Sequence, residues 1–135
     1  MNLQAQQVEL QVQKGIRQAE DDLVLWIQAA LDTTKYGNLE ESQFRNLVRV
    51  ADTTDSAEVI KNFIRYQVGR DKKWGRGKGS LAEKIIQDID GNIKKIAQSI
   101  AEASQGEVKK IWLELIRRYL GYGSRHLKYL KEGLD

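Results

Sequence analysis

The sequence contains no cysteine, no proline and a single histidine, and each scarcity excludes a class of protein. Without cysteine there can be no disulfide, no thiolate nucleophile and no cysteine-type metal site. The lone histidine, His126, argues against a transition-metal site, so we expect no cofactor. No apolar run approaches the roughly 20 residues of a membrane-spanning helix, and the opening residues lack a secretion signal. We therefore expect a cytoplasmic protein with no membrane partner.

The absence of proline is also informative about the fold. At average usage, a chain of 135 residues would carry several prolines. Their absence, with abundant Gln, Lys, Glu, Leu, Ile and Ala, is typical of long helices. No stretch alternates apolar and polar residues as a strand does. The chain length suits one domain over residues 1–135, and the sequence predicts an all-α fold, a compact bundle of about five helices.

Apolar residues three and four positions apart outline these helices. The first extends to a turn at 33–37, although Gly15 and a polar opening leave 1–15 as a stretch able to be flexible. The second covers about 40–51. The third is capped by Thr54 or Asp55 and runs into a basic, glycine-rich loop at 69–79.

Two capping-box patterns open the remaining helices. Ser80 and Glu83 start the fourth helix, and Ser104 and Glu107 start the fifth. The fifth helix is aromatic and basic and extends to about residue 130. Glycines inside helices are destabilising. They therefore predict a kink or a close crossing at Gly91, and a bend or a close backbone approach at Gly121 and Gly123.

Positive charge is concentrated between Val59 and Gly79, where seven cations stand against one acid, Asp71. This stretch has a net charge of +6, whereas the whole chain carries only +3. Residues 1–58 carry 5 basic and 10 acidic side chains, and residues 107–131 carry 7 basic and 2 acidic. Such asymmetry favours a protein that binds a polyanion and stacks on copies of itself. The alternative is chance clustering on solvated helix faces.

Cations, glycines and aromatic residues together are what binding a nucleic-acid backbone requires. Arg45 and Arg49 add a second basic pair, four residues apart on one face of the second helix. The predicted nucleic-acid-binding residues are Arg45, Arg49, Lys61, Arg65, Arg70, Lys72, Lys73, Trp74, Arg76 and Lys78. Trp74 either stacks on a base or sugar or pins the loop to the bundle.

No catalytic pattern is present. The segment GRGKGS at 75–80 resembles a phosphate loop only superficially, because its spacing is wrong and no strand precedes it. Asp88 and Asp90 lie two apart on a helix and do not face one target. The serines have no base beside them in a recognisable pattern. We therefore expect no enzymatic activity.

Three segments resemble the small, all-helical subunit of type III-A (Csm) CRISPR effector complexes. LEESQFRNL at 39–47 resembles that family's Leu-Thr-Thr-Ser-Lys-Ile/Leu-Arg-Asn-Leu segment, with acids in place of both threonines. FIRYQVGR at 63–70 resembles its Tyr-x-Ala-Gly-Arg helix end. The aromatic, basic segment 112–130 resembles its closing helix. The three occur in the same order and at similar spacing, although a Cmr-type subunit or another type III variant remains an alternative.

The resemblance implies a non-catalytic RNA-binding subunit. Its partners would be guide RNA and target RNA, the large polymerase-like subunit, and copies of itself. Arg45 and Arg70 match the family's arginines. Each also has a structural interpretation, as an ion-pair partner of Glu41 for Arg45 and as a helix-end charge for Arg70. Two other functions stay open from the sequence: a stand-alone helical DNA-binding protein and a protein–protein adaptor.

Overall fold

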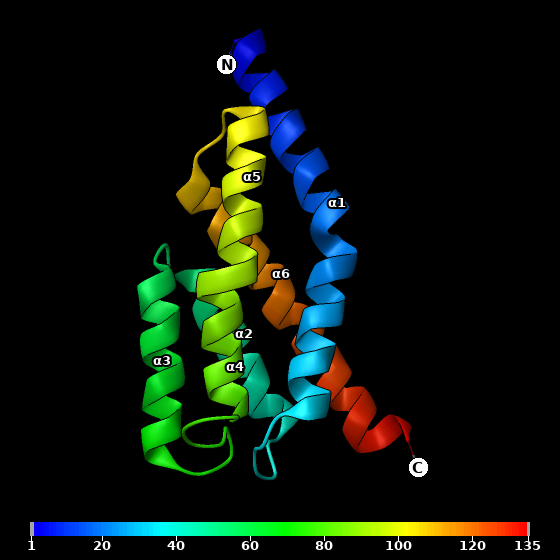
Figure 1. Ribbon diagram of the computed structural model, residues 1–135, viewed down its shortest axis with the longest axis vertical. Coiled ribbons are helices and arrows are strands. Elements are labelled where there is room, and N and C mark those ends of the chain that lie inside the picture. Colours follow the sequence, from blue (N-terminus) through cyan, green and yellow to red (C-terminus); the bar gives the residue numbers. More distant parts are fainter. Residues whose placement is uncertain (1, 135) are drawn as a thin grey trace.

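The computed structural model describes residues 2–134, and its helices follow the predicted order. The elements are α1 (Leu3–Thr33), α2 (Glu41–Thr53), α3 (Ala57–Arg70), α4 (Leu81–Asp88), η1 (Ile89–Ile93), α5 (Lys94–Ser104), α6 (Val108–Lys128) and η2 (Tyr129–Gly133). The turns η1 and η2 are π-helical. Because α4, η1 and α5 run on without a break, and η2 continues α6, five helices pack as the predicted all-α bundle (Figure 1).

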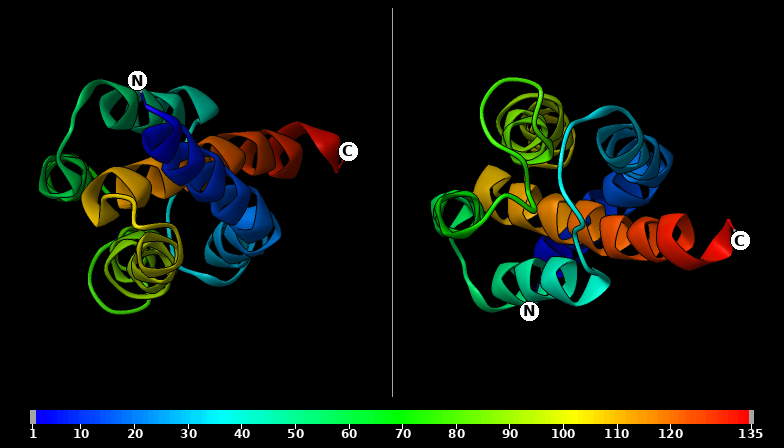
Figure 2. Two further views of the ribbon diagram at one scale, coloured as in Figure 1. Left: turned by 90° about the horizontal axis from the view of Figure 1, so that it is seen from above. Right: turned by 90° about the horizontal axis from the view of Figure 1, so that it is seen from below.

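Helix α6 lies at the centre of the bundle. It contacts α1, α2, α5 and η1. Views along the bundle show α2 on one side of α6 and α4 and α5 on the other (Figure 2). Leu113, Leu115 and Ile116 point in different directions around α6 and are all buried. A helix that is apolar on several faces is one that neighbours surround.

Helix α1 begins at Leu3, so residues 3–15 are part of this helix. Its first turn is capped by Asn2, whose Oδ1 accepts a hydrogen bond from Ala5 N at 2.7 Å. Val12 is the first buried residue, and the turns before it extend beyond the bundle (Figure 1). Gly15 interrupts the helical sequence pattern because Ile100 packs closely against it. A Cβ on Gly15 would lie 2.9 Å from the side chain of Ile100.

The predicted irregularity at Gly91 takes the form of a π-helical turn, η1, rather than a close crossing. No atom lies within 4 Å of the position a Cβ would occupy on Gly91. Trp112 Nε1 donates a hydrogen bond to the carbonyl oxygen of Ile89 at 2.8 Å, and Lys94 Nζ lies 4.9 Å from the Trp112 ring centroid. The extra residue of a π turn displaces backbone groups, and here a side chain from α6 satisfies one of them.

Helix α6 passes through Gly121 and Gly123 without interruption. A Cβ on Gly123 would lie 2.7 Å from Ile27 Cγ1 and 2.7 Å from Phe44 Cζ. Gly121 faces open space. The close approach predicted for this pair is therefore made at Gly123, by side chains of α1 and α2 rather than by a backbone.

The capping predictions are half right at one place and wrong at two. Ser80 Oγ accepts from Glu83 N at 3.1 Å, but the Glu83 carboxylate accepts from Gly79 N rather than from Ser80 N, so only one half of the capping box forms. Helix α3 is capped by Ser56 instead of Thr54 or Asp55. Ser104 ends α5, and its hydroxyl donates to the carbonyl of Ile100 at 2.6 Å. A serine at the last residue of a helix can donate to a carbonyl, whereas a serine before a helix accepts from an amide, and the four-residue pattern does not distinguish these roles.

Candidate nucleic-acid interface

The basic loop, residues 71–80, joins α3 to α4 and is fixed to the bundle by Trp74. This side chain is only 1% exposed, and its ring centroid lies 5.4 Å from that of Phe44 on α2. The carbonyl oxygen of Trp74 accepts a hydrogen bond from Ala82 N at 3.0 Å. Trp74 is therefore not available to stack on a base. Of its two predicted roles, the structure supports the one that pins the loop.

A second set of backbone hydrogen bonds joins the basic loop to the turn after α1. Lys35 N donates to Gly79 O at 2.9 Å, and Leu81 N donates to Lys35 O at 3.2 Å. Gly37 N donates to Lys73 O at 3.1 Å. The two connections lie side by side at one end of the bundle (Figure 1). This pairing adds Lys35, an exposed cation absent from the predicted site, to the same end.

The contact between the basic loop and the turn at Lys35 requires a glycine at Gly75. Its φ of +79° is in the left-handed region. A Cβ on Gly75 would overlap the carbonyl oxygen of Lys35 and lie 2.8 Å from Ser80 Cβ. Gly77 has a similar φ of +70°, but nothing lies within 4 Å of its Cβ position. The glycines therefore let the loop fold back against the Lys35 turn, rather than making it flexible.

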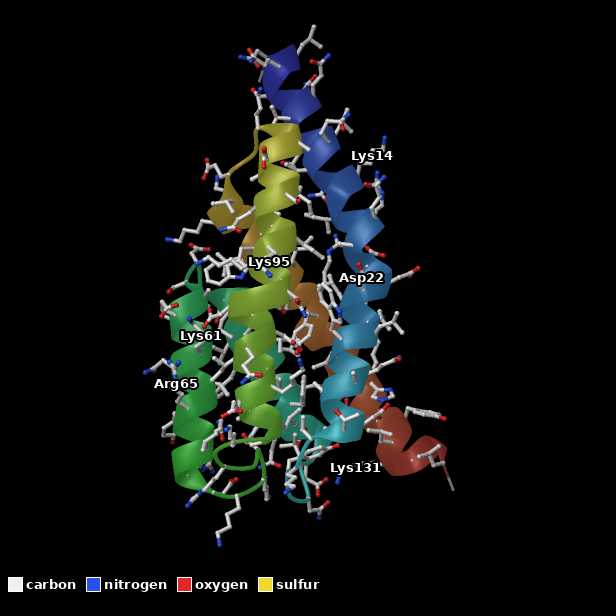
Figure 3. The ribbon with its side chains drawn as sticks, viewed as in Figure 1. Lys14, Asp22, Lys61, Arg65, Lys95 and Lys131 are labelled. Atoms are coloured by element: carbon white, nitrogen blue, oxygen red, sulfur yellow. The ribbon has the colours of Figure 1, made fainter. Side chains whose placement is uncertain are left out.

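Most cations of the loop and of the end of α3 are exposed, and Lys73 is half-buried. Arg65 is exposed on α3 (Figure 3). Arg70 is also exposed and is the last residue of this helix. Within residues 2–134 no ion pair or side-chain hydrogen bond engages the following cations: Arg65, Arg70, Lys72, Lys73, Arg76 and Lys78. Asp71 Oδ1 accepts a hydrogen bond from Lys73 N at 2.8 Å instead of pairing with a cation. These charges remain free to meet a polyanion.

Lys61 was predicted to bind nucleic acid, and its position contradicts this. Its side chain is only 8% exposed, and Nζ lies 2.8 Å from Asp90 Oδ1 and 2.5 Å from Glu58 Oε2. Burial alone would lower the pKa of Lys61, but the hydrogen bonds and charges of Asp90 and Glu58 raise it above its ordinary value. Lys61 is thus a charged link between α3 and η1, and it carries no free positive charge for a ligand.

The two arginines of α2 each contact a neighbour on the same helix. Arg45 Nε is 3.3 Å from Glu41 Oε1, which matches its structural interpretation, although its side chain remains 58% exposed. Arg49 donates to Asn46 Oδ1 at 3.0 Å. The two arginines therefore differ from the cations of the loop and of the end of α3, whose side chains have no such partner within residues 2–134.

Tyr66 is the aromatic residue that is accessible near these cations. It is 59% exposed, its ring centroid lies 6.2 Å from that of Phe63, and Arg70 follows one helical turn later. An exposed ring beside a cation is the arrangement that stacks on bases of single-stranded nucleic acid. The sequence prediction included Trp74 and not Tyr66, whereas the packing buries Trp74 and leaves Tyr66 accessible.

The start of α4 is not a phosphate-binding site. Leu81 N and Ala82 N donate to backbone carbonyls, and Glu83 N donates to the Ser80 hydroxyl. Glu83 Oε1 also accepts from Gly79 N at 3.3 Å, so a negative charge occupies the position where a phosphate would bind. The superficial likeness of GRGKGS to a phosphate loop therefore has no counterpart in the geometry.

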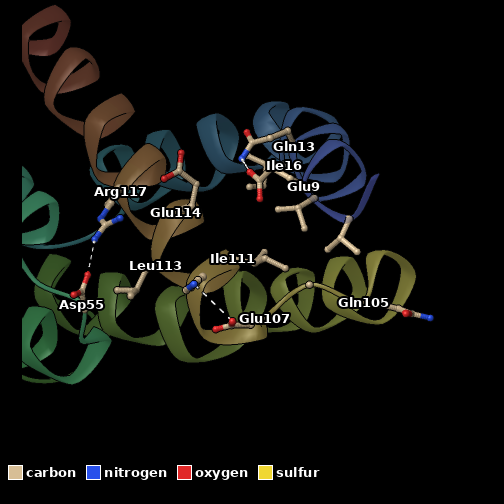
Figure 4. Close-up of a pocket in the computed structure, with 14 residues that line it drawn as sticks. Glu9, Gln13, Ile16, Asp55, Gln105, Glu107, Ile111, Leu113, Glu114 and Arg117 are labelled. Atoms are coloured by element: carbon tan, nitrogen blue, oxygen red, sulfur yellow. Dashed lines mark hydrogen bonds and ion pairs between the residues drawn. The ribbon is translucent and has the colours of Figure 1, made fainter. Parts of the chain in front are cut away.

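A cleft of about 580 Å³ lies at the other end of the molecule, between the first half of α1 and the start of α6 (Figure 4). Its cations are engaged: Lys110 lies 3.6 Å from Glu107, and Arg117 donates to the carbonyl of Ala51 at 2.8 Å. Arg117 thereby satisfies the end of α2. This cleft offers no free positive charge to a nucleic acid.

Several other polar side chains pair with one another inside the bundle or at its surface. The Tyr119 hydroxyl donates to Asp88 Oδ2 at 2.6 Å inside the core, and Lys84 lies 2.9 Å from Asp88 Oδ1. His126 Nε2 lies 2.8 Å from Asp32 Oδ1. Residues 2–134 contain no group of three or more His, Asp or Glu placed to hold a metal ion.

None of the described helices is long and apolar enough to cross a membrane. Comparisons of this chain with protein families, with curated proteins and with solved structures gave no match.

Proposed function

We propose that this protein binds RNA without catalysing a reaction. The observation that carries the proposal is the group of free cations at the end of α3 and on the basic loop, held on a fixed backbone. The phosphate-binding residues would be Arg65, Arg70, Lys72, Arg76 and Lys78, with Lys73 and Lys35 beside them. Tyr66 would stack on an unpaired base.

A fixed loop suits phosphate binding for an energetic reason. Ordering a mobile loop on binding costs about 1–2 kcal/mol of backbone entropy per residue. In this protein the entropy of the loop is already lost when the chain folds, because hydrogen bonds to Lys35 and Gly37 and the burial of Trp74 fix the loop in place. The favourable term is the release of counterions from the phosphate backbone, which does not depend on base sequence.

The biological setting rests on the three motif segments. We propose the small subunit of a type III CRISPR effector complex, with guide and target RNA, the large polymerase-like subunit and copies of itself as partners. Leu39, Phe44 and Leu47 of the first motif are fully buried, so these positions serve the core. Arg45 and Arg70 are exposed and fit contacts to an RNA backbone. A cytoplasmic location is part of the same proposal.

Salt-dependent RNA binding tests the site. The loop variant Lys72→Ala/Arg76→Ala/Lys78→Ala removes three free cations, and each phosphate contact contributes about 0.7 to the logarithmic salt slope for a single strand. We expect weaker binding and a slope smaller by about 2, measured by fluorescence anisotropy between about 50 and 200 mM salt.

The matched control is Lys14→Ala/Lys95→Ala/Lys109→Ala. It removes the same charge from exposed residues on other parts of the molecule, and Lys14 and Lys95 lie well away from the loop (Figure 3). Equal losses in the two variants would contradict the assignment of the loop as the binding site. Preference for a palindromic DNA duplex would favour the DNA-binding alternative, and tight binding of an acidic peptide instead of RNA would favour an adaptor.

The proposed setting has its own test. The tagged protein, purified from its own cells at low salt, should carry repeat-derived guide RNA and the large polymerase-like subunit. Sequencing of the bound RNA and identification of the co-purified proteins would measure this. RNA without repeat sequence would contradict the CRISPR assignment and leave RNA binding by the loop intact.

A further inference from the structure

A small cleft lies directly beside the proposed phosphate-binding residues, between the end of α3 and the first two turns of α4. Its volume is about 300 Å³. The lining includes the apolar residues Val68, Ala82 and Ile86, and Arg65 and Gly77 also face it. Arg65 is thus a free cation on the wall of the cleft, and the exposed cations Arg76 and Lys78 flank Gly77 in the sequence. A volume at the small end of the range for ligand pockets suits a single ring system.

We propose that this cleft takes one base of the bound RNA, while Arg65, Arg76 and Lys78 hold the neighbouring phosphates. This inference rests on the proposed function. The argument for a nucleotide is charge complementarity next to an apolar wall: the base contacts Val68 and Ile86, and its charged backbone meets the cations. An apolar side chain of a partner protein would match the wall but leave the cations without a partner.

The polar rim of the cleft indicates which base it takes. Glu83 and Gln87 line the cleft on successive turns of α4. Glu83 Oε1 accepts hydrogen bonds from Gly79 N at 3.3 Å and from Gln87 Nε2 at 3.2 Å. No donor in residues 2–134 occupies the other carboxylate oxygen. An ionised carboxylate only accepts hydrogen bonds, so it selects a base edge that donates them.

Guanine is the base that best meets this requirement. Its Watson–Crick edge carries two adjacent donors, N1–H and the exocyclic amine, and both can donate to the free carboxylate oxygen of Glu83. Uracil offers one donor between two carbonyl oxygens, and those oxygens are repelled by a negative charge. A good paired contact of this kind discriminates between bases by roughly tenfold or more. We therefore expect RNA with a guanine at the bound position to be preferred over RNA with uracil.

The test compares three RNAs of one length and one charge: an oligouridylate, the same chain with one central guanosine, and a chain of abasic nucleotides. The expected order of affinity, from fluorescence anisotropy at fixed salt, is guanosine-containing, then uridylate, then abasic. The variant Glu83→Gln keeps the shape and can still accept from Gly79, but it turns one acceptor into a donor. We expect it to abolish the preference for guanosine.

Glu102→Gln is the matched control, because Glu102 is an exposed acid on α5 away from the cleft. It should keep the full guanosine preference. Equal affinity for all three RNAs, with the salt slope unchanged, would overturn the base-binding inference and leave backbone binding by the loop intact. Failure of every RNA to bind would instead refute the proposed function, and this inference with it.

Discussion

Replacement of Gly75 by alanine separates the shape of the basic loop from its charge. Any residue with a side chain pays a penalty in the left-handed region, about 1–2 kcal/mol for alanine. At Gly75 the new Cβ would also overlap the Lys35 carbonyl oxygen. The pairing of Lys35 with Gly79 and Leu81 would then have to open. Two hydrogen bonds contribute about 0.5–1.5 kcal/mol each. The expected destabilisation for Gly75→Ala is therefore about 2–5 kcal/mol.

Gly77→Ala is the control, because Gly77 has a similar positive φ and open space around it. It should lose only the conformational part, about 1–2 kcal/mol. Urea unfolding measures both values. In RNA binding at fixed salt, Gly75→Ala should weaken affinity more than Gly77→Ala, although neither removes a charge. Equal stabilities would refute the steric argument. A destabilised Gly75→Ala protein with unchanged RNA affinity would show that docking of the loop is not needed for binding.

Two further predictions concern the core. Gly123→Ala should destabilise the protein by about 1–3 kcal/mol in urea unfolding, because side chains already occupy the space, whereas Gly121→Ala should stabilise it by up to about 1 kcal/mol. Tyr119→Phe should cost about 1–3 kcal/mol by leaving Asp88 without its buried donor. Burial and the charge of Asp88 raise the pKa of Tyr119 well above its ordinary 10.0. The neutral phenol therefore stabilises the fold fully below pH 10 and progressively less above it, so wild type should lose more stability than Tyr119→Phe between neutral and alkaline pH. Equal losses of stability in wild type and Tyr119→Phe would contradict this role of the Tyr119 phenol.

The helices could be predicted because their signal is periodic and local. Residues such as Ile16, Leu23 and Ile27 repeat at helical spacing, and the structure buries them on one face of α1. Gly123 shows where this reasoning stops. A glycine inside a helix signals that something unusual occurs, but which neighbour approaches it is decided by the packing of α6 against α1 and α2.

The candidate site was harder to predict because its arrangement depends on contacts distant in the sequence. The pairing of Lys61 with Asp90 joins residues 29 positions apart, and no local pattern marks it. The docking of Lys35 on Gly79 uses backbone atoms, which every residue has and which leave no trace in composition. Trp74 and Tyr66 are alike as aromatic residues among cations, and only the position of Phe44 decides which one is buried.

The two parts of the proposed site depend on different features of the chain. Arg65 and Arg70 are carried by α3, whose buried face would hold them in place even if the loop opened. Lys72, Arg76 and Lys78 are carried by a loop that contributes its own anchor, Trp74, to the core. Loss of the Trp74 anchor would therefore leave Arg65 and Arg70 in place and let Lys72, Arg76 and Lys78 move. A fixed set of five charges binds a polyanion with less ordering cost than two fixed and three mobile ones. In the proposed function, the buried tryptophan would thus support RNA binding without contacting RNA, by setting the spacing of the charges around it.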